Sequence, residues 1–116
     1  QRPSGAFPGF APFPFHRAWD FGTAWADAGV ICPWTIYQVY GDKRILAEHY
    51  DAMEEWIAYC KSSTKGTLLR PVHGYGDWLS IKADTPKDVL ATAYFAYSTA
   101  LVARAIRAAT RSPVTV

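Results

Sequence analysis

The chain has 116 residues, which is enough for at most one domain. Half of the residues are apolar and 16% are aromatic, so the chain can build a packed core, which argues against disorder. The net charge of +2 is small and the Lys and Arg residues are scattered, which argues against a nucleic-acid partner. No uninterrupted apolar run approaches about 18 residues, so the sequence predicts no transmembrane span and no membrane partner.

The N-terminus and the two cysteines give weaker indications. The chain begins at Gln1 rather than Met and no signal pattern follows, so we expect it to be processed, truncated or incompletely recorded there. Cys32 and Cys60 match neither a redox pair nor a zinc site. A disulfide between neighbouring helices is one interpretation. Two buried free thiols fit the usual burial of free Cys better, and this favours a reducing compartment, the cytoplasm.

Residues 1–22 are predicted to form an extended loop rich in Pro and Phe. Pro8, Pro12 and Pro14 exclude a helix interior from this stretch. Its phenylalanines require cover, and three kinds of cover remain open. The loop can strap a helical surface, form a wall of a pocket, or dock on protein outside this chain.

The first helix is predicted over residues 23–40. Thr23 or Asp20 can act as its N-cap, and Gly41 suits the left-handed position that ends a helix. Pro33 removes one hydrogen bond and should kink the helix. Apolar residues lie on nearly every face, which is typical of an inner helix covered on more than one side.

A second helix is predicted over residues 43–61, with Asp42 as its N-cap. Its apolar residues recur at steps of three and four, and its other face is charged, so it is an amphipathic outer helix. The two helices together form an antiparallel hairpin.

A loop over residues 62–84 separates this hairpin from the third predicted helix, over 86–111, and residues 112–116 form a tail. Thr85 is the expected N-cap of the third helix, and Pro86 occupies its first position. The first half of this helix is apolar and of the inner type. No strand pattern competes, so the predicted fold class is all-α, with three long helices.

The sequence contains no phosphate loop, no nucleophile elbow and no metal-ligand spacing, so we expect no cofactor and no metal. Two carboxylates lie next to tryptophans: Asp27 near Trp25, and Asp77 beside Trp78. Aromatic rings stack on sugar rings, and carboxylates accept hydrogen bonds from sugar hydroxyls, so this pairing favours a carbohydrate pocket. Two other residues of the 62–84 loop are further candidates for the same pocket, namely His73 and Tyr75.

On paper, Asp27 and Asp77 could also be the two carboxyl groups that glycoside hydrolysis requires. The competing interpretation is structural: Asp27 caps a helix or bonds the backbone, and both tryptophans belong to the core.

Several spaced motifs resemble bacterial α-L-rhamnosidases of glycoside hydrolase family 78. They are residues 25–34, which begin Trp25-Ala26-Asp27, then Tyr40-Gly41-Asp42, Gly76-Asp77-Trp78-Leu79 and residues 85–96. The resemblance implies an (α/α)6 barrel, of which this chain is one sector. It also implies an inverting hydrolase that removes terminal α-L-rhamnose, with Trp25, Asp27, Asp77 and Trp78 at or near the sugar pocket. The family usually has glycine where Ala26 stands.

In that family the general acid and the general base are glutamates in motifs upstream and downstream of this region, and neither motif is present here. We therefore name no catalytic residue, interpret Asp27 and Asp77 as binding or supporting residues, and expect the 116 residues alone to be inactive. The alternative function is a non-catalytic helical module derived from such a barrel. In both cases the inner helices need cover, from the remainder of the barrel or from a second copy.

Overall fold

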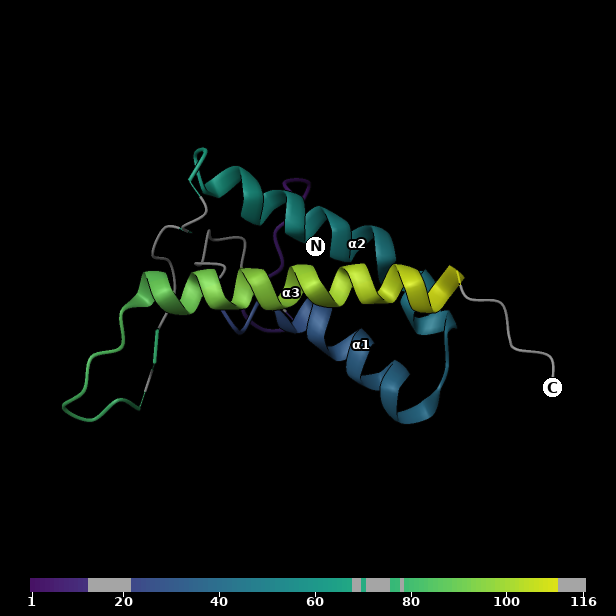
Figure 1. Ribbon diagram of the computed structural model, residues 1–116, viewed down its shortest axis with the longest axis horizontal. Coiled ribbons are helices and arrows are strands. Elements are labelled where there is room, and N and C mark those ends of the chain that lie inside the picture. The colour runs from purple at the N-terminus through teal and green to yellow at the C-terminus, as the bar shows by residue number, and fades with distance from the viewer. Residues whose placement is uncertain (13–21, 68–69, 71–75, 78, 111–116) are drawn as a thin grey trace.

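The computed structural model describes residues 1–12, 22–67, 70, 76–77 and 79–110. It contains three helices, α1 (Ala28–Tyr40), α2 (Arg44–Ser63) and α3 (Lys87–Thr110), and each packs against the other two (Figure 1). The described residues contain no strand, and the predicted all-α class is confirmed.

Helix α1 begins at Ala28, later than the predicted start at residue 23. The difference has a local cause: Ala24 adopts φ +72°, a left-handed conformation that interrupts a right-handed helix. The other end agrees with the prediction, because Gly41 is left-handed and its N–H donates to the carbonyl of Tyr37 at 2.8 Å. Of the two predicted N-caps, Thr23 lies in the turns before the helix, and Asp20 lies outside the described residues.

Helix α2 begins beside Asp42, whose Oδ1 accepts the backbone N–H of Arg44 at 2.9 Å. The Arg44 guanidinium bonds the same carboxylate and lowers the pKa of Asp42 to about 2. This pair is exposed to solvent, so it aligns the helix start and adds little to stability. The core side of α2 carries Leu46, Met53, Trp56 and Cys60, as expected for an amphipathic helix.

Helix α3 follows Pro86 and runs along the whole bundle (Figure 1). It is long and apolar enough to cross a membrane by length and composition, with a mean hydropathy of 1.4 over its most apolar window. Yet Leu101 and Ala105 are buried against the other helices. The composition therefore also fits an inner helix that packs on two sides.

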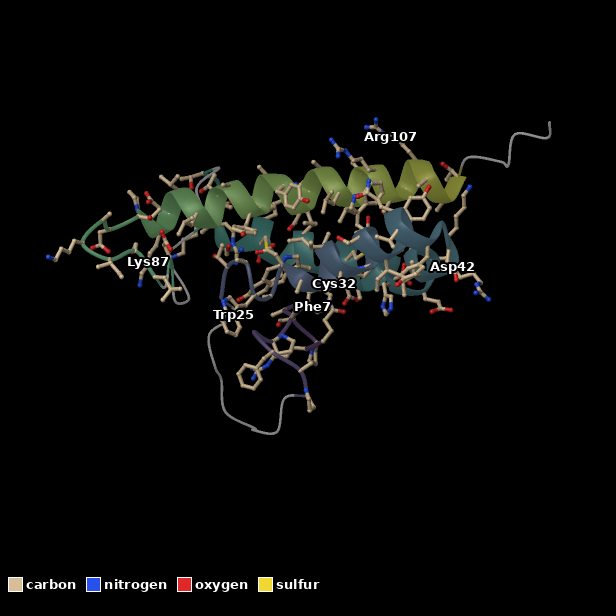
Figure 2. The ribbon with its side chains drawn as sticks, turned by 90° about the horizontal axis from the view of Figure 1, so that it is seen from below. Phe7, Trp25, Cys32, Asp42, Lys87 and Arg107 are labelled. Carbon is tan, nitrogen blue, oxygen red and sulfur yellow. The ribbon has the colours of Figure 1, made fainter. Side chains whose placement is uncertain are left out.

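The N-terminal residues 1–12 pack against α2. Phe7 lies with its ring centroid 5.9 Å from that of Trp56, and Gln1 Nε2 donates to the carbonyl of Ala52 at 2.7 Å. Figure 2 shows this segment beneath the helices, on the side away from α3. For these residues the strap interpretation is the one that the contacts favour; residues 13–21 lie outside the described part.

We predict that Gly29→Ala destabilises the fold. Alanine normally stabilises a helix interior relative to glycine by about 1 kcal/mol. At Gly29, however, an added Cβ would clash with the ring of Phe7, which would have to move. The expected loss is about 1–3 kcal/mol in the free energy of unfolding, measured by urea denaturation. In a Phe7→Ala background the same substitution should be neutral or stabilising. An equal loss of unfolding free energy in that background would contradict the proposed clash between position 29 and Phe7.

Candidate functional site

A buried carboxylate joins the three helices. The side chain of Asp27 is 0% exposed and its two oxygens accept three hydrogen bonds. Oδ1 accepts Trp56 Nε1–H from α2 at 2.9 Å and the Ser98 hydroxyl from α3 at 2.8 Å. Oδ2 accepts the backbone N–H of Ala24 at 2.9 Å. Asp27 is therefore satisfied entirely from within the chain, by two side chains and one backbone group.

The ring of Trp56 connects this carboxylate to a buried arginine. Arg70 is 4% exposed, and its Cζ lies 5.2 Å from the Trp56 ring centroid, a cation–π geometry. Its backbone N–H lies 3.3 Å from Thr92 Oγ1, which accepts it. Nε and Nη1 of Arg70 are buried and have no hydrogen-bond acceptor in the described part of the chain. Among the described residues, the indole face of Trp56 is therefore a direct contact of this guanidinium.

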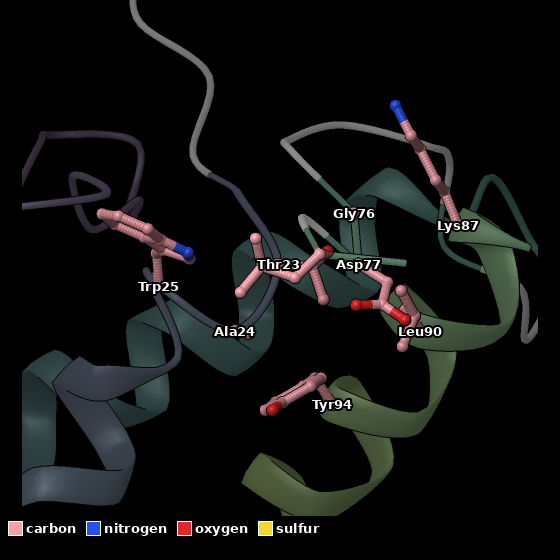
Figure 3. Close-up of a pocket in the computed structure, with 9 residues that line it drawn as sticks. Thr23, Ala24, Trp25, Gly76, Asp77, Lys87, Leu90 and Tyr94 are labelled. Carbon is pink, nitrogen blue, oxygen red and sulfur yellow. The ribbon is translucent and has the colours of Figure 1, made fainter. Parts of the chain in front are cut away.

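A pocket of about 360 Å³ opens beside this cluster, between the turn that precedes α1 and the first turns of α3 (Figure 3). Trp25 forms one side and is 42% exposed, so part of its indole is available to a ligand. Asp77 forms the other side, with Thr23 between the two in Figure 3. The remaining lining residues are Ala24, Gly76, Leu79, Lys87, Leu90 and Tyr94.

Asp77 is held at the pocket by its neighbours. Its Oδ2 accepts the Thr85 hydroxyl at 2.9 Å. The Asp77 carbonyl accepts the hydroxyl of Ser80 at 3.0 Å. Among the described residues no donor reaches Asp77 Oδ1, and the side chain is exposed. One carboxylate oxygen is therefore available to a ligand hydroxyl.

Glycine at position 76 suits this turn for two reasons. Its φ is +72°, a region that L side chains rarely adopt. A Cβ at position 76 would also lie 3.0 Å from Cε of Lys87, the first residue of α3.

The structure brings together two of the predicted site residues. Trp25 and Asp77 line one pocket although they are far apart in the sequence. Asp27 is near but does not line it, because its side chain is buried. His73, Tyr75 and Trp78 lie outside the described residues, so their roles stay predictions.

The sequence reasoning missed Lys87, Leu90 and Tyr94 as pocket residues. A signal for them exists, because steps of three and four place them on one face of the predicted third helix. What the pattern does not indicate is that this face meets the turn around Thr23.

The pocket has the groups for binding a neutral polyol. Among the described lining residues Asp77 is the only carboxylate, whereas glycoside hydrolysis requires two carboxyl groups. The described residues also contain no group of three or more His, Cys, Asp or Glu side chains placed to hold a metal ion.

Comparison with known proteins identifies the family. Residues 1–114 match the model of the bacterial alpha-L-rhamnosidase 6 hairpin glycosidase domain. The chain belongs to this family. The predicted family and the predicted sector of a helical barrel are thereby confirmed, since the solved structure described next is that of an alpha-L-rhamnosidase with such a helical domain.

Two relatives and one solved structure give the extent of the match. An alpha-L-rhamnosidase from Streptomyces avermitilis is 46% identical over 90% of this chain, and one from Formosa agariphila is 32% identical over 90%. The crystal structure of the Streptomyces avermitilis alpha-L-rhamnosidase complexed with L-rhamnose matches 97% of this chain with a TM-score of 0.85 and 42% identity. The chain spans only 10% and 12% of the two relatives and 11% of the crystallised protein.

The two cysteines differ in exposure, and only one agrees with the prediction. Both thiols are free, but Cys32 is exposed on α1, while Cys60 is buried near Asp27 and Arg70. Cys32 was expected to be buried; it lies on a face of α1 that no described residue covers. Burial raises the pKa of the Cys60 thiol from 9.0 to about 12, with Arg70 opposing the shift and Asp27 adding to it.

We predict that Cys60 resists alkylation in the folded protein. At about pH 8 iodoacetamide should modify Cys32, and Cys60 only after unfolding in urea, as read by peptide mass spectrometry. Because the folded pKa is raised, the stability that Cys60 contributes is complete below about pH 9 and declines as the pH rises towards 12. In Cys60→Ala, the free energy of unfolding should therefore fall less steeply as the pH rises from about 9 towards 12. Rapid labelling of Cys60 in the native protein would contradict its burial.

Proposed function

We propose that this chain is a segment of an α-L-rhamnosidase, and that its pocket contributes to the binding of a terminal α-L-rhamnose. The observation that carries the proposal is the meeting of Trp25 and Asp77 at one pocket. Further support comes from the solved relative, which is complexed with L-rhamnose and is 42% identical to this chain.

The lining residues suit the chemistry of a deoxyhexose. The half-exposed indole of Trp25 can stack on the C–H face of a pyranose ring. Asp77 can accept hydrogen bonds from ring hydroxyls, while Lys87 and Tyr94 can donate them. Rhamnose carries a methyl group in place of a primary alcohol, and Leu90 offers an apolar contact for it.

Catalysis is assigned to groups outside this chain. An inverting glycosidase uses two carboxyl groups about 6.5–9.5 Å apart, with a water between one of them and the sugar. The described pocket lining supplies one carboxylate, Asp77, which the Thr85 hydroxyl already bonds. We therefore give Asp77 a binding role and expect the isolated chain to show no turnover of an aryl α-L-rhamnoside.

We predict that Trp25→Ala and Asp77→Asn each weaken binding of L-rhamnose in the enzyme. For Asp77→Asn, losing a hydrogen bond to a charged group costs about 1.5–3 kcal/mol, roughly a 10- to 100-fold rise in the dissociation constant. For Trp25→Ala, the lost stacking contact should raise the dissociation constant as well. Isothermal titration calorimetry with L-rhamnose measures this directly.

A matched control exists on an exposed surface away from the pocket. Asp51→Asn neutralises an exposed carboxylate on the charged outer face of α2. It should leave the dissociation constant unchanged. Unaltered binding in Trp25→Ala and Asp77→Asn would reject the assignment of the pocket.

The alternative, a self-associating helical module, has one observation in its favour. Large apolar side chains are exposed along the two inner-type helices, notably Ile36, Val39 and Tyr40 on α1 and Val89, Tyr97 and Ile106 on α3. In the proposed enzyme the rest of the helical barrel covers these faces. In the alternative, a second copy covers them.

We predict that the isolated chain does not persist as a compact monomer, because these apolar faces favour association in water. Size-exclusion chromatography with light scattering measures its state. A stable monomer would contradict the need for cover. A discrete oligomer with no affinity for L-rhamnose would favour the alternative function.

A further inference from the structure

Ala24 has an unusual backbone conformation at the edge of the pocket. Its φ of +72° lies in the left-handed region, which costs an L residue other than glycine roughly 1–2 kcal/mol. Ala24 lines the pocket and directly precedes Trp25. This dihedral angle helps to set the direction in which the chain enters Trp25, and with it the position of the indole at the pocket. Strained backbone at such a place needs a compensating contact.

The side chain of Asp27 supplies that contact. Its Oδ2 accepts the N–H of Ala24 at 2.9 Å. Its Oδ1 is fixed from two directions, by Trp56 on α2 and by Ser98 on α3. The acceptor that holds Ala24 is therefore anchored in the core and cannot follow the turn if the turn relaxes.

We propose that Asp27 is a positioning residue for the sugar pocket: its carboxylate holds Ala24 in the left-handed conformation and thereby sets Trp25 against the ligand. The proposal rests on the proposed function, because it assigns Asp27 a task in the same pocket. It places Asp27 behind the pocket wall, where it acts through the backbone of Ala24 rather than by touching the sugar.

Asp27→Asn is the direct test because it keeps the size of the side chain. An amide has one acceptor oxygen, so when that oxygen faces Trp56 and Ser98, the NH2 group faces the N–H of Ala24. Two donors then oppose each other, and the left-handed conformation loses its support. If Ala24 retains that conformation about one tenth of the time, the dissociation constant for L-rhamnose rises about tenfold, while kcat at saturating aryl α-L-rhamnoside changes less.

Two further variants separate positioning from general stability. Ser98→Ala removes a donor from the same carboxylate but leaves the Ala24 bond, so it should lower the melting temperature and leave the dissociation constant unchanged. Ala24→Gly removes the steric cost of φ +72°, so in the Asp27→Asn background it should restore most of the lost affinity. These measurements are made on the full-length enzyme, with L-rhamnose as the titrant.

The outcomes decide between the proposals. Absence of L-rhamnose binding in the unmodified enzyme overturns the proposed function. If the unmodified enzyme binds L-rhamnose and Asp27→Asn binds it equally well, the positioning role is overturned. The same holds if Ser98→Ala loses as much affinity as Asp27→Asn, or if Ala24→Gly does not restore the affinity of Asp27→Asn.

If Asp27→Asn alone fails to fold, the double variant Asp27→Asn with Ala24→Gly is tested instead. Folding with restored affinity supports the proposal, and failure to fold assigns Asp27 to the core alone. Hydrogen exchange at the Ala24 amide, faster in Asp27→Asn and unchanged in Ser98→Ala, gives a readout that needs no ligand.

Discussion

The arrangement of the three helices depends on a buried carboxylate. A charged group in a protein interior is tolerated only when its hydrogen bonds are satisfied, because the interior replaces the water that would otherwise bind it. Asp27 meets this condition with one donor from α2, one from α3 and one from the turn that leads into α1. Loss of any one donor removes a hydrogen bond from a buried charged group, at a cost of about 1.5–3 kcal/mol. The carboxylate thus specifies one relative placement of the three helices.

The same contact connects the core to the pocket. Asp27 bonds the backbone next to Trp25, and it bonds Trp56, whose ring is covered by the guanidinium of Arg70. Trp25, the aromatic residue of the pocket, belongs to the turn before α1. Arg70 belongs to the segment between α2 and α3, which also carries Asp77, the carboxylate of the pocket. Because the Asp27 carboxylate accepts the indole N–H, the ring face of Trp56 should become more attractive to a cation. Asp27 and Arg70 therefore stabilise each other through the ring of Trp56.

The exposed apolar faces of α1 and α3 agree with the proposed function. The chain matches a 6 hairpin domain and spans about a tenth of the length of its relatives. If it is a segment of such a domain, as we propose, helices of the remainder would cover these faces. That cover would account for Val39 at 66% exposure and for the membrane-like composition of α3.

The helices themselves could be predicted from the sequence, because their signals are local. Gly41 ends α1 as expected, and the spacing of apolar residues predicts α2 with its core side. Helix α3 begins at Lys87, one residue after Pro86, its predicted first position. The sequence also named Trp25 and Asp77 as candidates, each as one half of a carboxylate–tryptophan pair (Asp27 with Trp25, Asp77 with Trp78). That these two residues from different pairs line one pocket came from the structure, and their role in sugar binding stays a proposal. The place of Asp27 could not be predicted, because its donors Trp56 and Ser98 lie 29 and 71 residues away along the chain. The start of α1 could not be predicted either, because no residue type around Ala24 indicates its left-handed conformation. A carboxylate beside a tryptophan suits a sugar pocket or a buried junction equally well in sequence, and only packing of the three helices decided that Asp27 faces inward, because that is where its donors meet.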